Sequence, residues 1–297
     1  MQADRSFVSS FRSAKKIRWI TRYEVYVLML IIGELINCTR KKVGESARAR
    51  DAEFFRQLAR KQVEAGAHVL DVNGGVPDQE VELLSWLVDL VQGVTDVPLS
   101  LDSADPIALS KALPRCKERP IVNSISDEPA RWALLPLLRE HKPKLIALCM
   151  SEAGPPSTVE DRVATASKLV DRLTAEGFAV DDLYVDACVM PAATSQDQGV
   201  KLLTAVRQIV ERYPGIHISA GVSNVSFGLP QRKLLNETFI LLLMAHGLDA
   251  AIVDPCDQQL IANVLAAEAL LGRDEYSGEY LRAYRQGRLT PAAPVHA

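Results

Sequence analysis

The sequence predicts an α/β protein that folds as a single (β/α)8 TIM barrel. From residue 27 onward, short apolar runs bounded by turn residues alternate with stretches of helical periodicity, and eight of each can be counted. Alternation of this kind indicates a parallel sheet, and eight units close naturally into a barrel. A chain of 297 residues with 48% hydrophobic content suits one such barrel.

A doubly wound open sheet is the alternative that shows the same alternation. It usually carries a GxGxxG motif directly after the first strand. The residues at that place, 33–37 (GELIN), do not match this motif. The sequence therefore favours the closed barrel.

The N-terminal region superficially resembles a signal peptide. Its first 25 residues are basic and lead into an apolar run at residues 25–32, and residues 35–38 (LINC) resemble a lipoprotein site. However, the run is far shorter than the roughly 20 residues that span a bilayer, and Asn37 is not the small residue that such cleavage prefers. We therefore predict a buried first strand.

The remaining elements follow in order, each strand justified by an apolar run and each helix by its periodicity. Predicted strands are 27–33, 67–72, 97–102, 119–123, 144–150, 182–187, 216–221 and 250–254. Predicted helices are about 47–65, 78–92, 106–113, 128–141, 158–176, 196–213, 231–246 and 257–271. We expect an N-terminal extension at 1–26, the barrel at 27–272, and a C-terminal helix and tail at 273–297 that frays at Pro291.

Polar side chains recur where the predicted strands end. Asp and Asn are common helix caps and turn residues, which explains any single one of them. Their recurrence at the end of the barrel that carries active sites instead predicts an acceptor-rich pocket for a ligand with several N–H donors. These residues are Glu34, Asn37, Asp71, Asn73, Asp102, Ser103, Asn123, Ser124, Asp186, Asn224 and Asp254.

The loop at residues 221–228 (GVSNVSFG) joins the seventh strand to a helix that Pro230 can open. It places Asn224 between Ser223 and Ser226, with glycines on both sides that allow close approach of a ligand. From spacing alone, a polar turn and a ligand-binding loop are both open.

Composition excludes several classes of function. The chain has 34 Lys plus Arg against 37 Asp plus Glu without a long block of one sign, so we expect no nucleic-acid partner. The five cysteines lack metal-ligand spacing, which indicates reduced cytosolic thiols and no metal site.

The run GVSNVSFGLP at residues 221–230, followed by Asn236, residues 247–249 (GLD) and 253–254 (VD), resembles a known family. It is similar to the methyltetrahydrofolate:corrinoid protein methyltransferases and to the folate module of cobalamin-dependent methionine synthase. Segments 33–37, 101–103, 123–124 and 185–186 resemble its other strand-end signatures, so the likeness covers roughly residues 30–285. The resemblance implies a pterin-binding barrel of the dihydropteroate synthase type.

The resemblance also implies roles for individual residues. Asp102, Asn123 and Asp186 would bind the amide and exocyclic amine edge of the pterin. Glu34 would support them, and Asn224 would face N5. The pterin site would also include Asn37 and Ser223. Two departures are Leu35, where the family usually has arginine, and Ala187, where proline is common.

The activity implied by the resemblance moves the N5-methyl group between 5-methyltetrahydrofolate and the cobalt of cobalamin. A partner corrinoid protein would carry the cobalamin, because no DxHxxG motif occurs here. Without an acid in the seventh loop, we expect water to protonate N5 and Asn224 to bind the protonated form. The direction of transfer stays open, and we expect a cytoplasmic homodimer without membrane contact.

Three alternatives remain open. A dihydropteroate synthase-like enzyme needs a cationic diphosphate site, for which the seventh and eighth loops offer no suitable Lys/Arg cluster. A zinc-dependent methyltransferase needs Cys and His ligands at metal spacing, which are missing. The third is a folate-binding protein without catalysis, which would bind methyltetrahydrofolate without transferring its methyl group.

Overall fold

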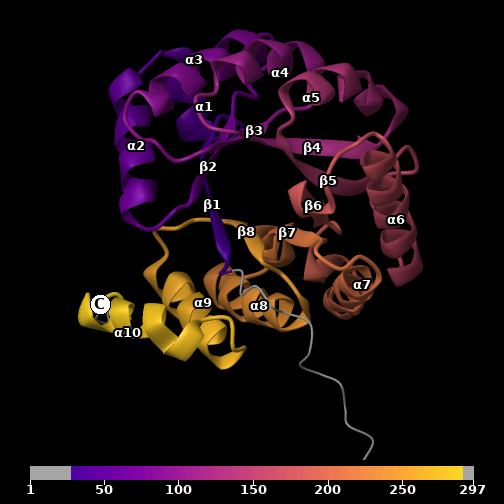
Figure 1. Ribbon diagram of the computed structural model, residues 1–297. Helices are drawn as coiled ribbons and strands as arrows, with labels where there is room; N and C mark the ends of the chain where they lie inside the picture. Colours follow the sequence, from indigo (N-terminus) through magenta and orange to yellow (C-terminus); the bar gives the residue numbers. More distant parts are fainter. Residues whose placement is uncertain (1–27, 290–297) are drawn as a thin grey trace, which may run out of the picture.

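The computed structural model, which describes residues 28–289, is a closed barrel of eight parallel strands surrounded by helices (Figure 1). Each strand pairs with the next in sequence, and β1 also pairs with β8 to close the sheet. The predicted fold class is therefore confirmed. The strands are β1 Leu30–Asn37, β2 Val69–Asn73, β3 Leu99–Asp102, β4 Ile121–Asp127, β5 Lys144–Ser151, β6 Leu183–Asp186, β7 His217–Gly221 and β8 Ala250–Val253.

Helices follow every strand and form the outer ring (Figure 1). They are α1 Lys41–Arg48, α2 Ala52–Glu64, α3 Glu80–Gln92, α4 Pro106–Ala112, α5 Leu135–His141, α6 Val159–Ala175, α7 Gln198–Arg212, α8 Arg232–His246, α9 Gln258–Leu270 and α10 Gly278–Arg285. Short 3-10 turns include η2 Pro129–Leu134 and η5 Val222–Ser226. The last helix matches the short C-terminal helix that the sequence predicts.

Two predicted helices have different internal structure. The stretch 47–65 is split between α1 and α2, because Arg50 has a left-handed φ of 52° and Asp51 caps α2 by accepting from the Phe54 backbone N–H at 3.1 Å. The stretch 128–141 begins as the 3-10 turn η2 and continues as α5. The first difference comes from a capping residue inside a periodic pattern. In the second, η2 and α5 each have a proline in their first turn.

Two predicted strand boundaries are wrong. The strand expected at 27–33 runs from Leu30 to Asn37, and the strand expected at 119–123 continues to Asp127. Apolar runs stop at these places, but the backbone ladder continues past them through register shifts at both strands. Residue 27, the basic N-terminal segment and the tail from residue 290 lie outside the described residues, and the expected domain boundaries stay a prediction.

The barrel interior is apolar toward the N-terminal ends of the strands and polar toward their C-terminal ends. The apolar part is filled by buried side chains from several strands, namely Ile32, Val69, Ile121, Ile146, Tyr184 and Ala250. Side chains two residues further along a strand point to the same face. Asp71 therefore follows Val69, Asn123 follows Ile121, and Asp186 follows Tyr184 toward the barrel mouth. The period of two thus explains how the site residues converge.

A cluster of one histidine, two carboxyl groups and a tyrosine lies at the opposite, N-terminal end of the barrel. His217 contacts Asp249 Oδ2 through Nδ1 at 2.7 Å and Asp181 through Nε2 at 3.3 Å. Its ring stacks on Tyr184 with centroids 4.7 Å apart. Burial disfavours the charged ring, but the two carboxylates outweigh it and raise the pKa of His217 above its usual value.

This cluster predicts a loss of stability with rising pH. A raised pKa means that the stabilisation is fully present below about pH 6.5 and is lost as pH rises through the folded-state pKa. We expect His217→Gln to cost about 1.5 to 3 kcal/mol in free energy of unfolding at pH 6, and clearly less at pH 9. Urea unfolding at both pH values measures this, and an equal loss at both would contradict it.

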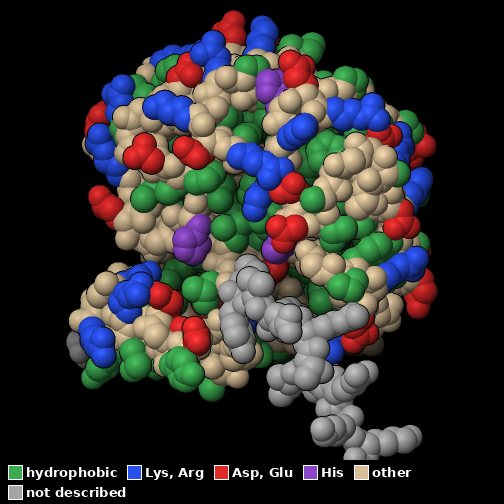
Figure 2. Space-filling model, viewed as in Figure 1, with side chains coloured by type: hydrophobic (Ala, Val, Ile, Leu, Met, Phe, Trp, Pro, Cys, Tyr) green, Lys and Arg blue, Asp and Glu red, His purple; other side chains and the backbone are tan. Residues whose placement is uncertain are grey.

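The surface agrees with the balanced composition. On the face shown in Figure 2, acidic and basic side chains are interspersed. No helix in residues 28–289 is long and apolar enough to span a membrane. The cysteines Cys38, Cys116, Cys149, Cys188 and Cys256 are free thiols, as the sequence predicts.

Candidate active site

Three predicted pterin-binding residues lie at the mouth of the barrel, on neighbouring or nearby strands. Asp102 ends β3 and pairs in register with Asn123 of β4. Asp186 ends β6, opposite Leu148 of β5 and Ser219 of β7. The barrel thus brings Asp102, Asn123 and Asp186 together at the end of the fold that carries active sites.

Hydrogen bonds from β2 hold two of these residues. Asn73 Nδ2 donates to Asp102 Oδ2 at 2.9 Å. Asn123 Nδ2 donates to Asp71 Oδ1 at 3.2 Å, and Ser100 Oγ donates to the same oxygen at 2.6 Å. Each pair joins a carboxyl group to an amide on another strand, so these polar groups are held in place before a ligand arrives.

The carboxyl groups have perturbed pKa values. Burial raises the pKa of Asp102, although the Asn73 hydrogen bond opposes the shift. Burial and the nearby Asp102 raise the pKa of Asp71 well above its ordinary value. Such desolvated acceptors gain most from a ligand that brings N–H donors to them.

Asp186 is supported by the backbone of the loop that follows it and by a buried arginine. Its Oδ1 accepts from the Cys188 backbone N–H at 2.8 Å, and burial raises its pKa to about 6. The loop after it is held by Arg162, a fully buried side chain that donates to the Ala187 carbonyl at 3.0 Å and to the Cys188 carbonyl at 3.4 Å. These two hydrogen bonds fix the backbone of the loop directly after Asp186.

Glu34 and Ser223 meet on one side of the mouth. Glu34 forms an ion pair with Arg40 at 2.7 Å and accepts from Ser223 Oγ at 3.5 Å. Arg40, five residues after Leu35, thus places a guanidinium group against Glu34. The Leu35 backbone N–H donates to the buried Gln62 side chain at 3.0 Å.

Asn37 has a local structural role. Its Oδ1 accepts from the Thr39 backbone N–H at 3.0 Å, which shapes the turn into α1. Its place in the pterin site therefore rests on the family resemblance.

Asn224 lies exposed in η5, beside the mouth. Its backbone carbonyl accepts from the Phe227 N–H at 3.2 Å, but its side chain forms no hydrogen bond to another described residue. Arg232 holds the loop by donating to the Ser223 carbonyl at 2.8 Å and to Ser226 Oγ at 3.0 Å. The amide is thus free to meet a ligand, while other groups hold the turn.

Sequence reasoning placed Asp71 and Asn73 among the polar strand-end residues but gave neither an individual role, and it missed Arg131 and Arg162. The first two follow from the period of two that begins at Val69 in β2. Arg131 has a buried Nη1 without a partner among the described residues, and its charge opposes the rise in the pKa of Asp102. No sequence signal singled out either arginine.

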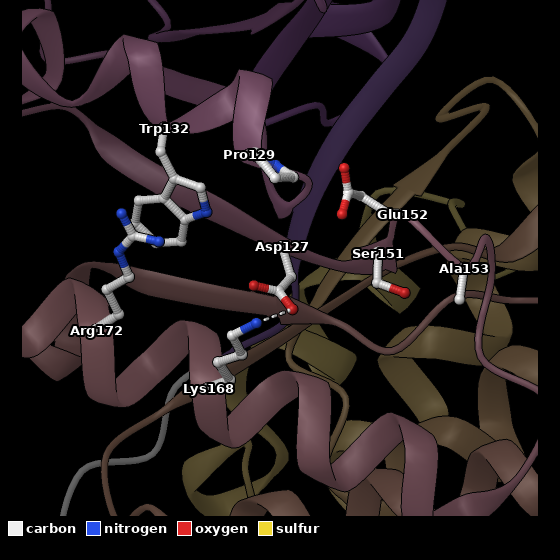
Figure 3. A pocket seen from close by; sticks show the side chains of 8 residues that line it. All are labelled: Asp127, Pro129, Trp132, Ser151, Glu152, Ala153, Lys168 and Arg172. Atoms are coloured by element: carbon white, nitrogen blue, oxygen red, sulfur yellow. Dashed lines mark hydrogen bonds and ion pairs between the residues drawn. The ribbon is translucent and has the colours of Figure 1, made fainter.

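A separate cavity of about 360 Å³ lies between the ends of β4 and β5 and the side of α6 (Figure 3). Lys168 pairs with Asp127 at 2.7 Å, and the Arg172 guanidinium lies 3.5 Å from the centroid of the Trp132 ring. The Trp132 Nε1 is buried without a partner in the described part of the chain. None of the predicted site residues lines this cavity.

The mouth of this barrel gathers buried carboxyl and amide groups, which suit a ligand with several N–H donors such as a pterin. The chain belongs to the pterin binding enzyme family, whose model matches residues 33–254. It is similar to the methylcorrinoid:tetrahydrofolate methyltransferase of Eubacterium limosum, with 38% identity over 267 residues that cover 89% of this chain and 98% of the relative.

Other relatives agree with this family. Methionine synthase of Mycobacterium leprae is 30% identical over 245 residues, which cover 76% of this chain but only 20% of that larger protein. Among solved structures, dihydropteroate synthase of Yersinia pestis has a TM-score of 0.66 at 16% identity, covering 85% of this chain and 98% of that one. The enzyme of Clostridium difficile has a TM-score of 0.68 at 15% identity, covering 84% and 98%. These structures establish the fold.

Proposed function

We propose that this protein is a methyltransferase that moves the N5-methyl group between 5-methyltetrahydrofolate and the cobalt of a corrinoid protein. The observation that carries the proposal is the 38% identity to a methylcorrinoid:tetrahydrofolate methyltransferase along nearly the full length of both chains. The acceptor-rich mouth supports it, because a reduced pterin offers N–H donors that carboxylates accept in parallel hydrogen bonds.

In this proposal Asp102, Asn123 and Asp186 bind the amide and amine edge of the pterin. Asp102 and Asp186 are buried carboxyl groups at strand ends, and Asn123 lies next to Asp102. Glu34, Asn37 and Ser223 complete the pterin site, and Glu34 and Ser223 are already in contact.

The chemistry depends on charge at N5, because the methyl group leaves readily only from a protonated nitrogen. Water supplies the proton, and Asn224 binds protonated N5 more strongly than neutral N5, which lowers the barrier. The corrinoid, on its own protein, supplies the cobalt that accepts or donates the methyl group. Within residues 28–289 no group hydrogen-bonds the Asn224 side chain, which supports this role.

A dihydropteroate synthase activity is less well supported. The solved structures of that class resemble this chain at 15–17% identity, which establishes a shared fold and no more. Such an enzyme must bind a diphosphate with cations. At the start of α8, Arg232 is already bound to the seventh loop, and Lys233 pairs with Asp257 at 3.2 Å.

A methyl-transfer assay tests the proposal in both directions. One arm combines reduced free cobalamin with methyltetrahydrofolate, and the other combines methylcobalamin with tetrahydrofolate. We expect enzyme-dependent transfer in both, because a catalyst lowers the barrier both ways. Binding of methyltetrahydrofolate without transfer in either arm would instead favour the non-catalytic folate-binding protein.

Assembly and location belong to the same proposal. We propose a homodimer in the cytoplasm, and the free cysteines are compatible with a reducing compartment. Light scattering at micromolar concentration measures the assembly, and a monomeric mass would contradict the dimer.

The pKa of Asp186 predicts how folate affinity depends on pH. Burial raises this pKa to about 6, so the group is ionised at pH 7 and largely protonated at pH 5. Because ligand N–H donors bind the carboxylate, affinity should fall by up to about tenfold per pH unit below pH 6. Calorimetric titration with tetrahydrofolate measures it, and Asp186→Asn should flatten the profile. A wild-type affinity that is constant from pH 7 to 5 would contradict this assignment.

A further inference from the structure

Asp71 is a buried carboxyl group on β2, beneath the residues proposed to contact the pterin. It is only 4% exposed and lies two residues after Val69 on the inward face of the barrel. Its Oδ1 accepts from Ser100 Oγ on the adjacent strand β3 at 2.6 Å and from Asn123 Nδ2 on the next strand, β4, at 3.2 Å. The position of this oxygen therefore determines which end of the Asn123 amide turns toward it.

We infer that Asp71 is a positioning residue that fixes the orientation of the Asn123 amide, so that the amide oxygen faces the ligand. This inference rests on the proposed function. An asparagine amide carries a donor on nitrogen and an acceptor on oxygen, and it can turn over in the same space. With Nδ2 bound to Asp71, the Asn123 Oδ1 is left to accept, and no other described residue donates to it.

The orientation holds in both protonation states of Asp71. A neutral carboxyl group keeps one oxygen that is only an acceptor, and the shared partners Ser100 and Asn123 are both donors to Oδ1. The raised pKa of Asp71, caused by burial and by Asp102, thus does not disturb the arrangement. A turned amide would instead present its NH₂ group to the N–H donors of the pterin, which loses a hydrogen bond and leaves donors unpaired.

The Asn73–Asp102 pair is arranged in a similar way. Asn73, at the end of the same strand, donates Nδ2 to Asp102 Oδ2 at 2.9 Å. Its own Oδ1 is held by the Gly75 backbone N–H at 2.8 Å, so the direction of its NH₂ group is set by the backbone. Strand β2 therefore orients ligand-binding groups on both β3 and β4 without being the proposed contact surface itself.

Asp71→Leu tests the inference, because leucine is close in size to aspartate but has no hydrogen-bond acceptor for the Asn123 Nδ2 group. For this variant we expect the Kd for tetrahydrofolate to rise about 10- to 100-fold and KM to rise with it, with little change in the rate at saturating folate. Asp71→Asn is the matched control: its oxygen can still accept from both Ser100 and Asn123, so its Kd should stay within about threefold of the wild-type value. The melting temperatures of both variants check that the fold is intact.

The exchange variant D71N/N123D supplies the sharpest control. It reverses the pair, with the donor on β2 and the acceptor on β4, and leaves a carboxylate oxygen at residue 123 for the ligand, so its Kd should return to within about fivefold of the wild-type value. Asn123→Asp alone places two carboxyl groups together and should bind poorly. Ser100→Ala, which removes the other partner of Asp71, should leave the Kd within about threefold.

Each outcome decides between orientation and simple packing. Weak binding in Asp71→Leu and Asn123→Asp, with recovery in D71N/N123D, supports the inference. An unchanged Kd in Asp71→Leu, an exchange variant no better than Asn123→Asp, or a loss in Ser100→Ala equal to that in Asp71→Leu would overturn it. If the wild-type protein fails to bind tetrahydrofolate, the proposed function fails instead.

Discussion

Asp102→Ala and Asp186→Ala are each expected to weaken tetrahydrofolate binding by about 1.5 to 3 kcal/mol, which is about 10- to 150-fold in Kd. Each substitution removes a buried acceptor from a pocket that neighbouring hydrogen bonds hold in place. The effect should fall on affinity rather than on the fold. Titration calorimetry measures the first, and thermal unfolding measures the second.

The isosteric variant Asp186→Asn sharpens this result. Its remaining side-chain oxygen can still accept from the Cys188 backbone N–H, so the loop keeps its hydrogen bond. What it loses is the ability to accept two ligand N–H groups as a carboxylate. We expect weak binding with a melting temperature close to wild type. Normal affinity in both alanine variants would rule out the pterin assignment.

Asn224→Ala is expected to slow methyl transfer about 10- to 150-fold while weakening tetrahydrofolate binding much less. A hydrogen bond to protonated N5 forms fully only as the methyl group leaves, and bonds to charged groups contribute about 1.5 to 3 kcal/mol. Stability should change little, since the turn is held by the Asn224 backbone carbonyl and by Arg232. Single-turnover rates, folate affinity and melting temperature of this variant separate the effects.

Gly221 supplies a matched comparison for Asn224. A Cβ atom at Gly221 would lie 3.3 Å from Asn224 Nδ2, which is a tight contact. Gly221→Val should therefore displace the amide and lower rate and affinity together. A stability loss in Asn224→Ala with a normal single-turnover rate would mean that Asn224 is a turn residue only.

Much of the site could be predicted because strand ends in a barrel meet at one place. Asp102, Asn123 and Asp186 each follow an apolar run, and the fold class alone gathers them. The extents of β1 and β4 could not be predicted in the same way. Their ladders continue beyond the apolar residues, so Glu34 and Asn37 belong to the strand itself.

The sequence by itself determined the barrel, because hydrophobic periodicity is a local property that eight successive units repeat. Only the tertiary structure decided which polar groups pair across strands. Asp71 with Asn123 and Asn73 with Asp102 depend on how the strands are staggered in the barrel. These hydrogen bonds join residues as many as 52 positions apart in the sequence, and no local sequence pattern encodes such pairs.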